Sequence, residues 1–228
     1  MSVSLQRPHS RALVAGGTGR VGRAIVERLR ADQWSVVAAG RAGGDLRTRD
    51  GAGELVADAV EQLGGLDLVV HAAGDGFAPK PVGEVTEADW DAALDVTAKG
   101  TFFLAQAAAP ALRESHGVLV ILEDVASFQA WSSFGPHCAA KAAQAMLTRV
   151  FARALAPEVR VCGIAPGPVA VEPGQEERRA AETLLGRVGS PADVAEAVIY
   201  LAGAGYVTGT TLVVDGGRLL QTVRRSDP

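Results

Sequence analysis

The chain has 228 residues, of which 48% are hydrophobic and 21% are charged, and its formal net charge at pH 7 is −4. This balance excludes an intrinsically disordered or collagen-like protein. The slight excess of acidic residues argues against nucleic-acid binding, which requires clustered Lys and Arg.

Neither the cysteines nor the apolar runs indicate export or membrane insertion. Two cysteines, Cys138 and Cys162, are too few for the disulfide framework of a small secreted domain. Polar and charged residues interrupt the first eleven positions, where a signal peptide needs an apolar stretch. Apolar runs such as residues 118–122 are far too short to span a membrane. We therefore expect a cytoplasmic protein that binds neither membranes nor nucleic acid.

Short apolar runs alternate with longer amphipathic stretches along the whole chain, which predicts strands alternating with helices. The runs are apolar at nearly every position, as in parallel strands that are covered on both faces. The predicted strands are 12–15, 35–39, 66–71, 118–122, 159–164 and 211–214, and the predicted helices are 20–31, 55–63, 87–112, 138–156, 175–185 and 192–202. We predict one doubly wound α/β domain over residues 1–228, with 1–10 and 221–228 flexible.

A glycine-rich turn, Gly16-Gly17-Thr18-Gly19, follows the first predicted strand and precedes a helix. Glycines allow the backbone to approach a pyrophosphate, and the helix N-terminus supplies unpaired N–H groups. Such a turn can also be a tight connection without a ligand. The strand–turn–helix context favours phosphate binding.

Further motifs, in the same order along the chain, resemble those of the short-chain dehydrogenase/reductase family. His71-Ala72-Ala73-Gly74 is similar to the family's Asn-Asn-Ala-Gly, and His137 and Lys141 occupy the places of its Tyr-x-x-x-Lys. Ala165-Pro166-Gly167 and residues 206–217 match directly. The resemblance covers nearly the whole chain, and it implies a Rossmann-type oxidoreductase that uses a nicotinamide cofactor.

Several departures from the family pattern resemble its pteridine reductase branch. Arg20 stands in the glycine motif where most relatives have the second glycine. Asp124 replaces the catalytic serine and lies 13 residues before His137, as the branch's aspartate lies before the tyrosine. Phe77 begins a Phe-x-Pro-x-Pro string similar to the one whose aromatic ring stacks on the pterin. The resemblance thus implies Phe77 and Asp124 as substrate-binding residues.

The resemblance implies three catalytic residues, His137, Lys141 and Asp124. Family members protonate the substrate from the tyrosine, while the lysine binds the nicotinamide ribose and lowers the tyrosine's pKa. His137 and Lys141 are four residues apart and share a helix face. A histidine with a pKa of about 6.5 can donate a proton at neutral pH. Asp124 would raise that pKa and Lys141 would lower it, so the charge of His137 stays open.

Two other family positions differ. Thr97 stands where an asparagine usually holds a water of the proton relay, and Cys162 replaces another asparagine. We assign neither a catalytic role, because a threonine lacks the amide's simultaneous donor and acceptor and Cys162 suits a buried apolar site.

The end of the second predicted strand indicates the cofactor. An acidic residue there would bind the adenosine ribose of NAD, but Arg41 follows Gly40 instead. Arg41 and Arg20 together would suit a 2′-phosphate, which predicts NADP(H). The resemblance places the other cofactor contacts on Gly16, Thr18, Val21, Gly22, Asp45, Ala73, Gly74, Lys141, Pro166 and Gly167. No metal site is expected.

The segment after Arg41 is unusually short. Only residues 42–44 separate Arg41 from Asp45, which resembles the family's adenine-side acid. A helical crossover between parallel strands needs at least ~10–12 residues. We therefore predict that the family's crossover helix between strands 2 and 3 is missing and that the sheet ends at or just beyond the second strand. An uncovered edge implies weaker cofactor binding or a partner over it.

These observations favour an NADPH-dependent reductase that acts on a carbonyl or C=N bond of a small substrate, such as a pteridine-like heterocycle. One alternative is a weakly active or inactive NADP(H)-binding scaffold or sensor, because the catalytic tyrosine is missing. A second alternative is a dehydratase or isomerase that uses Asp124 and His137 as an acid/base pair. Family habit implies a homotetramer or homodimer assembled through the helices 87–112 and 138–156.

Overall fold

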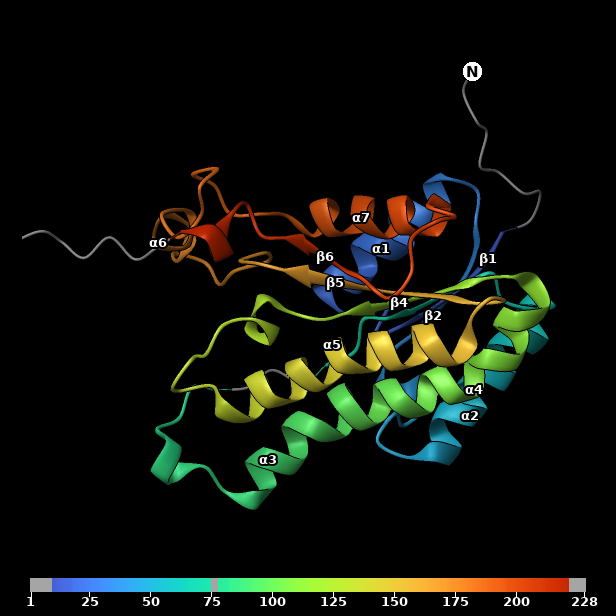
Figure 1. The fold of residues 1–228 in the computed structure, drawn as a ribbon, viewed down its shortest axis with the longest axis horizontal. Helices are drawn as coiled ribbons and strands as arrows, with labels where there is room; N and C mark the ends of the chain where they lie inside the picture. The colour runs from blue at the N-terminus through green and yellow to red at the C-terminus, as the bar shows by residue number, and fades with distance from the viewer. Residues whose placement is uncertain (1–9, 75–77, 222–228) are drawn as a thin grey trace, which may run out of the picture.

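The computed structural model describes residues 10–74 and 78–221. Its strands form one parallel sheet in the order β2-β1-β3-β4-β5-β6 (Figure 1). The strands are β1 (Arg11–Ala15), β2 (Ser35–Ala39), β3 (Leu68–His71), β4 (Val118–Leu122), β5 (Arg160–Pro166) and β6 (Thr211–Val214). The predicted single α/β domain is confirmed, whereas the flexibility predicted for the chain ends falls almost wholly outside the described residues.

Helices cover both faces of the sheet. They are α1 (Arg20–Ala31), α2 (Arg49–Leu63), α3 (Glu87–Leu94), α4 (Gly100–Ser115), α5 (Gly135–Leu155), α6 (Glu176–Ala180) and α7 (Pro191–Gly203). In Figure 1, α1 and α7 lie on one face, and α2, α4 and α5 lie on the other. None of the helices in the described ranges is both long and apolar enough to cross a bilayer.

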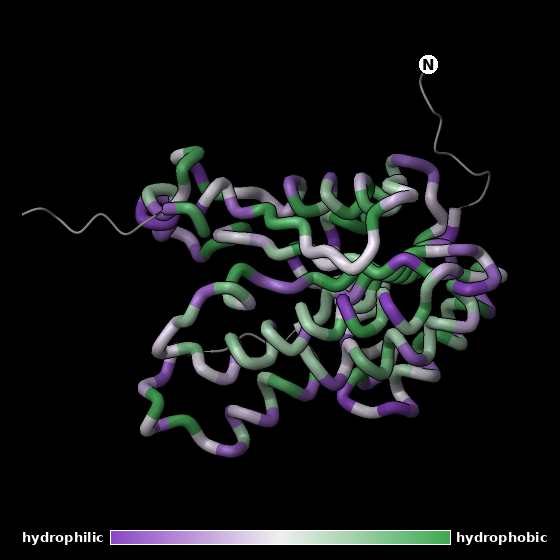
Figure 2. Tube along the Cα trace, viewed as in Figure 1, coloured by the Kyte–Doolittle hydropathy of each residue, from purple (hydrophilic) through white to green (hydrophobic). Residues whose placement is uncertain are grey.

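The two faces of the sheet carry separate apolar cores. Leu13, Val69 and Leu119 point into the core beneath α2, α4 and α5. Their neighbours along the same strands, such as Val14 and Val70, point into the core beneath α1 and α7. Alternate residues of each strand are therefore buried on opposite faces, which explains why the strand sequences are apolar throughout. The strands between the two helical layers are predominantly hydrophobic in Figure 2.

The edge of the sheet agrees with the expectation from the short segment. A single 3-10 turn, Arg41–Gly43, follows β2, and β2 is the edge strand. No α-helix lies between β2 and Asp45 in this described stretch. The helix α2 connects β2 to β3 of this sheet and begins at Arg49 rather than at the predicted residue 55. It is not the missing family helix, which would lie before Asp45. Thr48 caps α2 by accepting a hydrogen bond from the Gly51 N–H at 3.1 Å.

Two other predicted helices differ from the structure. The predicted helix 87–112 consists of α3 and α4, joined by a π-helical stretch, Asp95–Lys99. The predicted helix 175–185 shortens to α6, because the chain then turns back onto the segment after β6, where the Leu185 N–H donates to the Gly216 carbonyl at 3.1 Å.

Candidate functional site

A cavity of about 540 Å³ lies at the carboxyl ends of β1, β2 and β3. In an open parallel sheet this end is where ligands bind. Six of the predicted cofactor residues line it: Gly16, Thr18, Arg41, Asp45, Ala73 and Gly74. The loops come together because β1 is hydrogen-bonded to β2 on one side and to β3 on the other.

The glycine turn packs backbone against backbone. Gly16 has a φ of +86°, and a Cβ there would lie 2.5 Å from the carbonyl carbon of Ala72. A Cβ at Gly22 would collide with the Gly16 carbonyl oxygen. Gly19 precedes α1 as its N-cap and has no side chain to cap the helix, so within the described residues the first N–H groups of α1 have no side-chain acceptor. The turn is therefore shaped to hold a pyrophosphate on these N–H groups, and the residues present fit a dinucleotide.

The basic residues near this cavity are arranged differently from the sequence-based expectation. Arg41 lines the cavity, but Arg20 is paired with Glu172 at 2.9 Å, and both side chains are exposed. Arg47 also lines the cavity and is not among the residues predicted from the sequence. Arg47 Nη2 lies 2.9 Å from the Asp45 carboxylate, and its hydrogen bonds lower the pKa of that carboxyl to about 2. Asp45 is thus an anion held by an arginine.

Asp124 and His137 come together at the end of β4 and the start of α5. Their side chains are 3.7 Å apart, from His137 Nε2 to Asp124 Oδ2, which is an ion-pair distance rather than a hydrogen bond. The other carboxylate oxygen of Asp124 accepts from the Ala126 N–H at 2.8 Å, which fixes the side chain. The Trp131 ring is nearly parallel to the imidazole, with centroids 6.4 Å apart. His137 and Asp124 are 20% and 29% exposed, so a ligand can reach both.

Lys141 lies one turn along α5 from His137 and is buried. Its ammonium donates to the Leu122 carbonyl at 2.9 Å and to Gln144 Oε1 at 2.8 Å. Burial lowers the pKa of Lys141, and the nearby carboxylates of Asp124 and Glu123 oppose that shift. An ammonium has three N–H groups, and two of them are used by partners among the described residues, which leaves one for a ligand hydroxyl.

A buried polar network behind Lys141 was missed by the sequence argument. Gln144 Nε2 donates to Thr101 Oγ1 at 2.8 Å and lies 3.5 Å from His71 Nδ1. Burial lowers the pKa of His71 to about 4, so its imidazole is neutral at pH 7. The one available signal was a polar residue in an apolar context, since Gln144 lies within the Ala-rich stretch of α5.

Glu123 is a second buried group next to this network. It accepts a hydrogen bond from Thr148 Oγ1 at 2.6 Å, and burial raises the pKa of its carboxyl. A Cβ on Gly163 of β5 would collide with the carboxylate, so the glycine makes room for it. Glu123 thus stands behind Asp124, on the sheet side of the site.

A second cavity, of about 590 Å³, opens beside Asp124. Aromatic residues Trp131 and Phe134 and three arginines contribute to its wall. Pro79 and Gly167, each from a motif singled out in the sequence, also line it. Pro166 is the last residue of β5, directly before Gly167. Phe77, predicted to stack on the substrate, lies outside the described residues.

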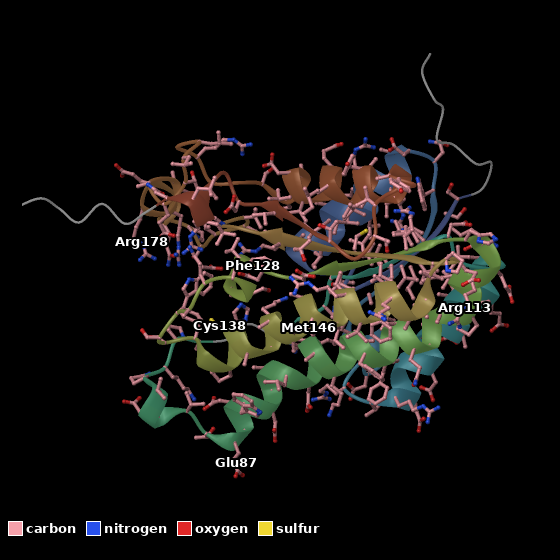
Figure 3. The ribbon with its side chains drawn as sticks, viewed as in Figure 1. Glu87, Arg113, Phe128, Cys138, Met146 and Arg178 are labelled. Atoms are coloured by element: carbon pink, nitrogen blue, oxygen red, sulfur yellow. The ribbon has the colours of Figure 1, made fainter. Side chains whose placement is uncertain are left out.

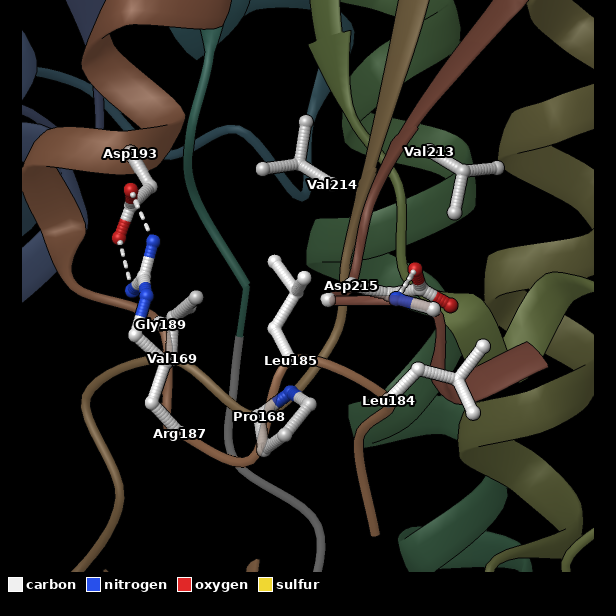
Figure 4. Close-up of a pocket in the computed structure, with 12 residues that line it drawn as sticks. Pro168, Val169, Leu184, Leu185, Arg187, Gly189, Asp193, Val213, Val214 and Asp215 are labelled. Carbon is white, nitrogen blue, oxygen red and sulfur yellow. Dashed lines mark hydrogen bonds and ion pairs between the residues drawn. The ribbon is translucent and has the colours of Figure 1, made fainter. Parts of the chain in front are cut away.

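A third cavity, of about 420 Å³, adjoins the second at Pro168 (Figure 4). Val169, Leu185 and Val214 give it an apolar wall. Arg187 and Asp193 form an ion pair at its rim, with Nη2 and Oδ1 3.0 Å apart. Asp193 also caps α7, so this pair stabilises the fold.

Comparison with known proteins agrees with this geometry. A family model described as enoyl-(acyl carrier protein) reductase matches residues 17–218. Human dehydrogenase/reductase SDR family member 4 is 32% identical over 239 residues, covering 90% of this chain and 86% of the human protein. The 2-dehydro-3-deoxy-D-gluconate 5-dehydrogenase of Escherichia coli K12 is 34% identical over 188 residues, with coverages of 77% and 74%.

A solved structure, blue fluorescent protein from a metagenomic library in complex with NADPH, has a TM-score of 0.84 and 25% identity, covering 93% of this chain and 99% of that chain. The finer similarity to pteridine reductases stays a prediction. The matched family model begins in the glycine turn and ends beyond β6. On this evidence the chain belongs to the short-chain dehydrogenase/reductase family of oxidoreductases, whose fold binds a nicotinamide cofactor.

Proposed function

We propose that the protein is an NADPH-dependent reductase that acts on a carbonyl or C=N bond of a small planar substrate, such as a pteridine-like heterocycle. The observation that carries the proposal is the Asp124–His137 pair on α5 and the end of β4, next to a cavity and one helical turn from Lys141. The reduced nicotinamide supplies a hydride when it is bound. All other tasks fall to residues of this chain.

His137 is the proposed proton donor. Its imidazole N–H would protonate the carbonyl oxygen or imine nitrogen as the substrate carbon accepts the hydride, so the product is an alcohol or amine. Asp124 orients the ring, because its carboxylate lies 3.7 Å from Nε2 and is itself anchored by the Ala126 N–H. The parallel Trp131 ring restricts the imidazole from the side.

Cofactor binding is proposed to use the first cavity. The N–H groups of Arg20, Val21 and Gly22 at the start of α1 would hold the pyrophosphate. Arg41 would bind the 2′-phosphate, and Arg20 would join it by leaving its exposed pair with Glu172, which costs little because exposed ion pairs contribute at most about 1 kcal/mol. The third N–H of Lys141 would bind a ribose hydroxyl.

We also propose a homotetramer or homodimer in the cytoplasm. Phe102 on α4 and Met146 and Val150 on α5 are exposed apolar side chains, which supports helix packing between subunits. Cys138 and Cys162 are both free thiols, as is usual in a reducing compartment.

One observation favours a second candidate, a cofactor-binding protein without catalysis. The Lys141 ammonium is already held by the Leu122 carbonyl and Gln144. The phenol that such a lysine activates in the family is absent, since His137 takes its place. A protein of this kind would bind NADPH but transfer no hydride.

The experiment that separates the two candidates combines NADPH titration by calorimetry with NADPH oxidation on a panel of planar ketones and dihydropterins. A reductase should turn over at least one panel member. His137→Ala should abolish turnover. His137→Tyr should instead keep turnover at the wild-type rate or raise it above that rate. The matched control is His116→Asn, because His116 is exposed and has a φ of +52°, which asparagine tolerates.

If wild type and His137→Ala are equally inert while both bind NADPH, the reductase proposal is wrong and the binding protein remains. An acid/base enzyme without net redox change would instead convert a hydroxy compound or isomer without oxidising NADPH.

A further inference from the structure

The cavity beside Asp124 contains a concentration of arginine side chains. Arg178 and Arg179 come from α6, and Arg218 comes from the turn after β6. In Figure 3, Arg178 lies between the α6 segment and the start of α5. Three guanidinium groups and Asp124 thus line one cavity of about 590 Å³, a size that suits a small ligand.

The acidic residues nearby do not balance these cations. Glu182 is shared, since both Arg179 Nη1 and Arg218 Nη2 lie 3.1 Å from its carboxylate. Within the described part of the chain, the hydrogen-bond partner of Arg178 is the neutral amide of Gln175, at a long 3.4 Å. Arg178 is exposed and carries no carboxylate partner among these residues. It is therefore available to an anion from solution.

An aromatic wall links the arginines to the proposed proton donor. The Arg218 guanidinium carbon lies 4.9 Å from the centroid of the Trp131 ring, and the same ring is parallel to His137 within 9°. Phe134 meets Trp131 edge to face, with centroids 5.8 Å apart. A flat ligand that packs against this wall would therefore be able to contact both His137 and the guanidinium groups.

We infer that the substrate of this site is a planar carbonyl compound that carries an oxyanion group, a carboxylate or a phosphate, which Arg178 binds with Arg218 beside it. The inference rests on the proposed reductase function for the identity of the reacting group, but the anion site stands on the cavity alone. Guanidinium groups bind both oxyanions by paired N–H donors, so the two share one chemistry.

The test measures binding separately from turnover. The probes are para-acetylbenzoate, para-acetylphenyl phosphate and the neutral para-acetylbenzamide, titrated by calorimetry into the full chain saturated with NADP+, which cannot reduce them, at fixed ionic strength. We expect at least one anionic probe to bind at least about tenfold more tightly than the amide, as a hydrogen bond to a charged group implies. Preference for the carboxylate or for the phosphate distinguishes the two classes of substrate.

The variants are Arg178→Gln, Arg218→Gln and the control Arg113→Gln. Arg113 is exposed at the far end of α4, and its loss changes the net charge equally (Figure 3). Arg178→Gln should weaken the anionic probe about tenfold or more and leave the amide unchanged. Arg218→Gln should also weaken binding of the anionic probe and leave binding of the amide unchanged. Near- and far-UV circular dichroism shows whether breaking the Arg218–Glu182 ion pair disturbs the fold.

Equal affinity for anionic and neutral probes, or an Arg178→Gln variant that behaves like Arg113→Gln, overturns the inference. Anion-selective binding without NADPH oxidation supports the anion site and contradicts the reductase function. Oxidation of NADPH by the amide and the anions with equal kcat/KM supports the reductase function and overturns the inference. The two proposals can thus fail separately.

Discussion

Replacing Gln144 by methionine tests whether the buried amide holds the Lys141 ammonium in place. Gln144 is fully buried, and its Oε1 accepts from Lys141 at 2.8 Å while its Nε2 donates to Thr101 at 2.8 Å. Methionine keeps nearly the same volume and shape, so the variant removes polar contacts without opening a cavity. Lys141 would then keep the Leu122 carbonyl as its remaining acceptor among these hydrogen bonds.

The expected cost follows from the two lost hydrogen bonds. A hydrogen bond to a charged group contributes about 1.5–3 kcal/mol, and a neutral one contributes about 1 kcal/mol. Both groups are buried, so solvent cannot replace the amide. We expect the free energy of unfolding to fall by about 3 kcal/mol, which in a domain of this size corresponds to a decrease in Tm of about 6–12 °C.

Urea unfolding followed by circular dichroism measures this loss, with Gln106→Met as the matched control. Gln106 is an exposed residue of α4, and the same substitution there should change stability by no more than about 0.5 kcal/mol. The deficit of Gln144→Met should shrink as pH rises, because the already lowered pKa of Lys141 allows the amine to become neutral. A deficit below about 1 kcal/mol, or one that does not change with pH, would refute the role assigned to Gln144.

Three further outcomes concern His71 and the cavity at the ends of β1, β2 and β3. The pKa of His71 is about 4 in the folded protein and near 6.5 in the unfolded chain. The free energy of unfolding should therefore fall by about 3 kcal/mol as pH drops from 6.5 to 4. Urea titrations of His71→Asn should not show this pH-dependent loss. Arg41→Asp should narrow or reverse the preference for NADPH over NADH, measured as the ratio of Kd values at one salt concentration; equal affinities in the wild type would contradict the assignment of Arg41. Gly16→Ala should abolish NADPH binding in calorimetry, because its Cβ would meet the Ala72 backbone at a φ of +86°.

Local patterns predicted most of the fold because they depend on neighbours in the sequence. Apolar runs and the glycine turn located the strands and the start of α1, and the short segment after Arg41 predicted the edge of the sheet. The start of α2 was missed because Gly51 and Gly53 lower helix propensity there, whereas the structure compensates with the Thr48 cap and the packing of Ala52 in the core. Tertiary contacts outweighed the local preference.

The candidate site was predicted less completely, because its decisive contacts join distant parts of the chain. The family resemblance implied Asp124 and His137 as partners, and the structure brings them together because Asp124 follows β4 and His137 lies in the first turn of α5. By contrast, Arg20 pairs with Glu172, 152 positions further along, and no local pattern connects them. The guanidinium of Arg218 over Trp131 is likewise a contact between two loops that only the finished sheet brings together.

The buried polar residues His71, Gln144 and Lys141 are easier to understand together than singly. A buried ammonium is tolerated only when its donors are satisfied, and here a carbonyl and an amide satisfy two of them before any ligand arrives. The neutral His71 imidazole beside the amide adds no second positive charge. Lys141 is therefore held in position in advance, and cofactor binding would need to order only the ligand and not the lysine, which reduces the entropic cost of association.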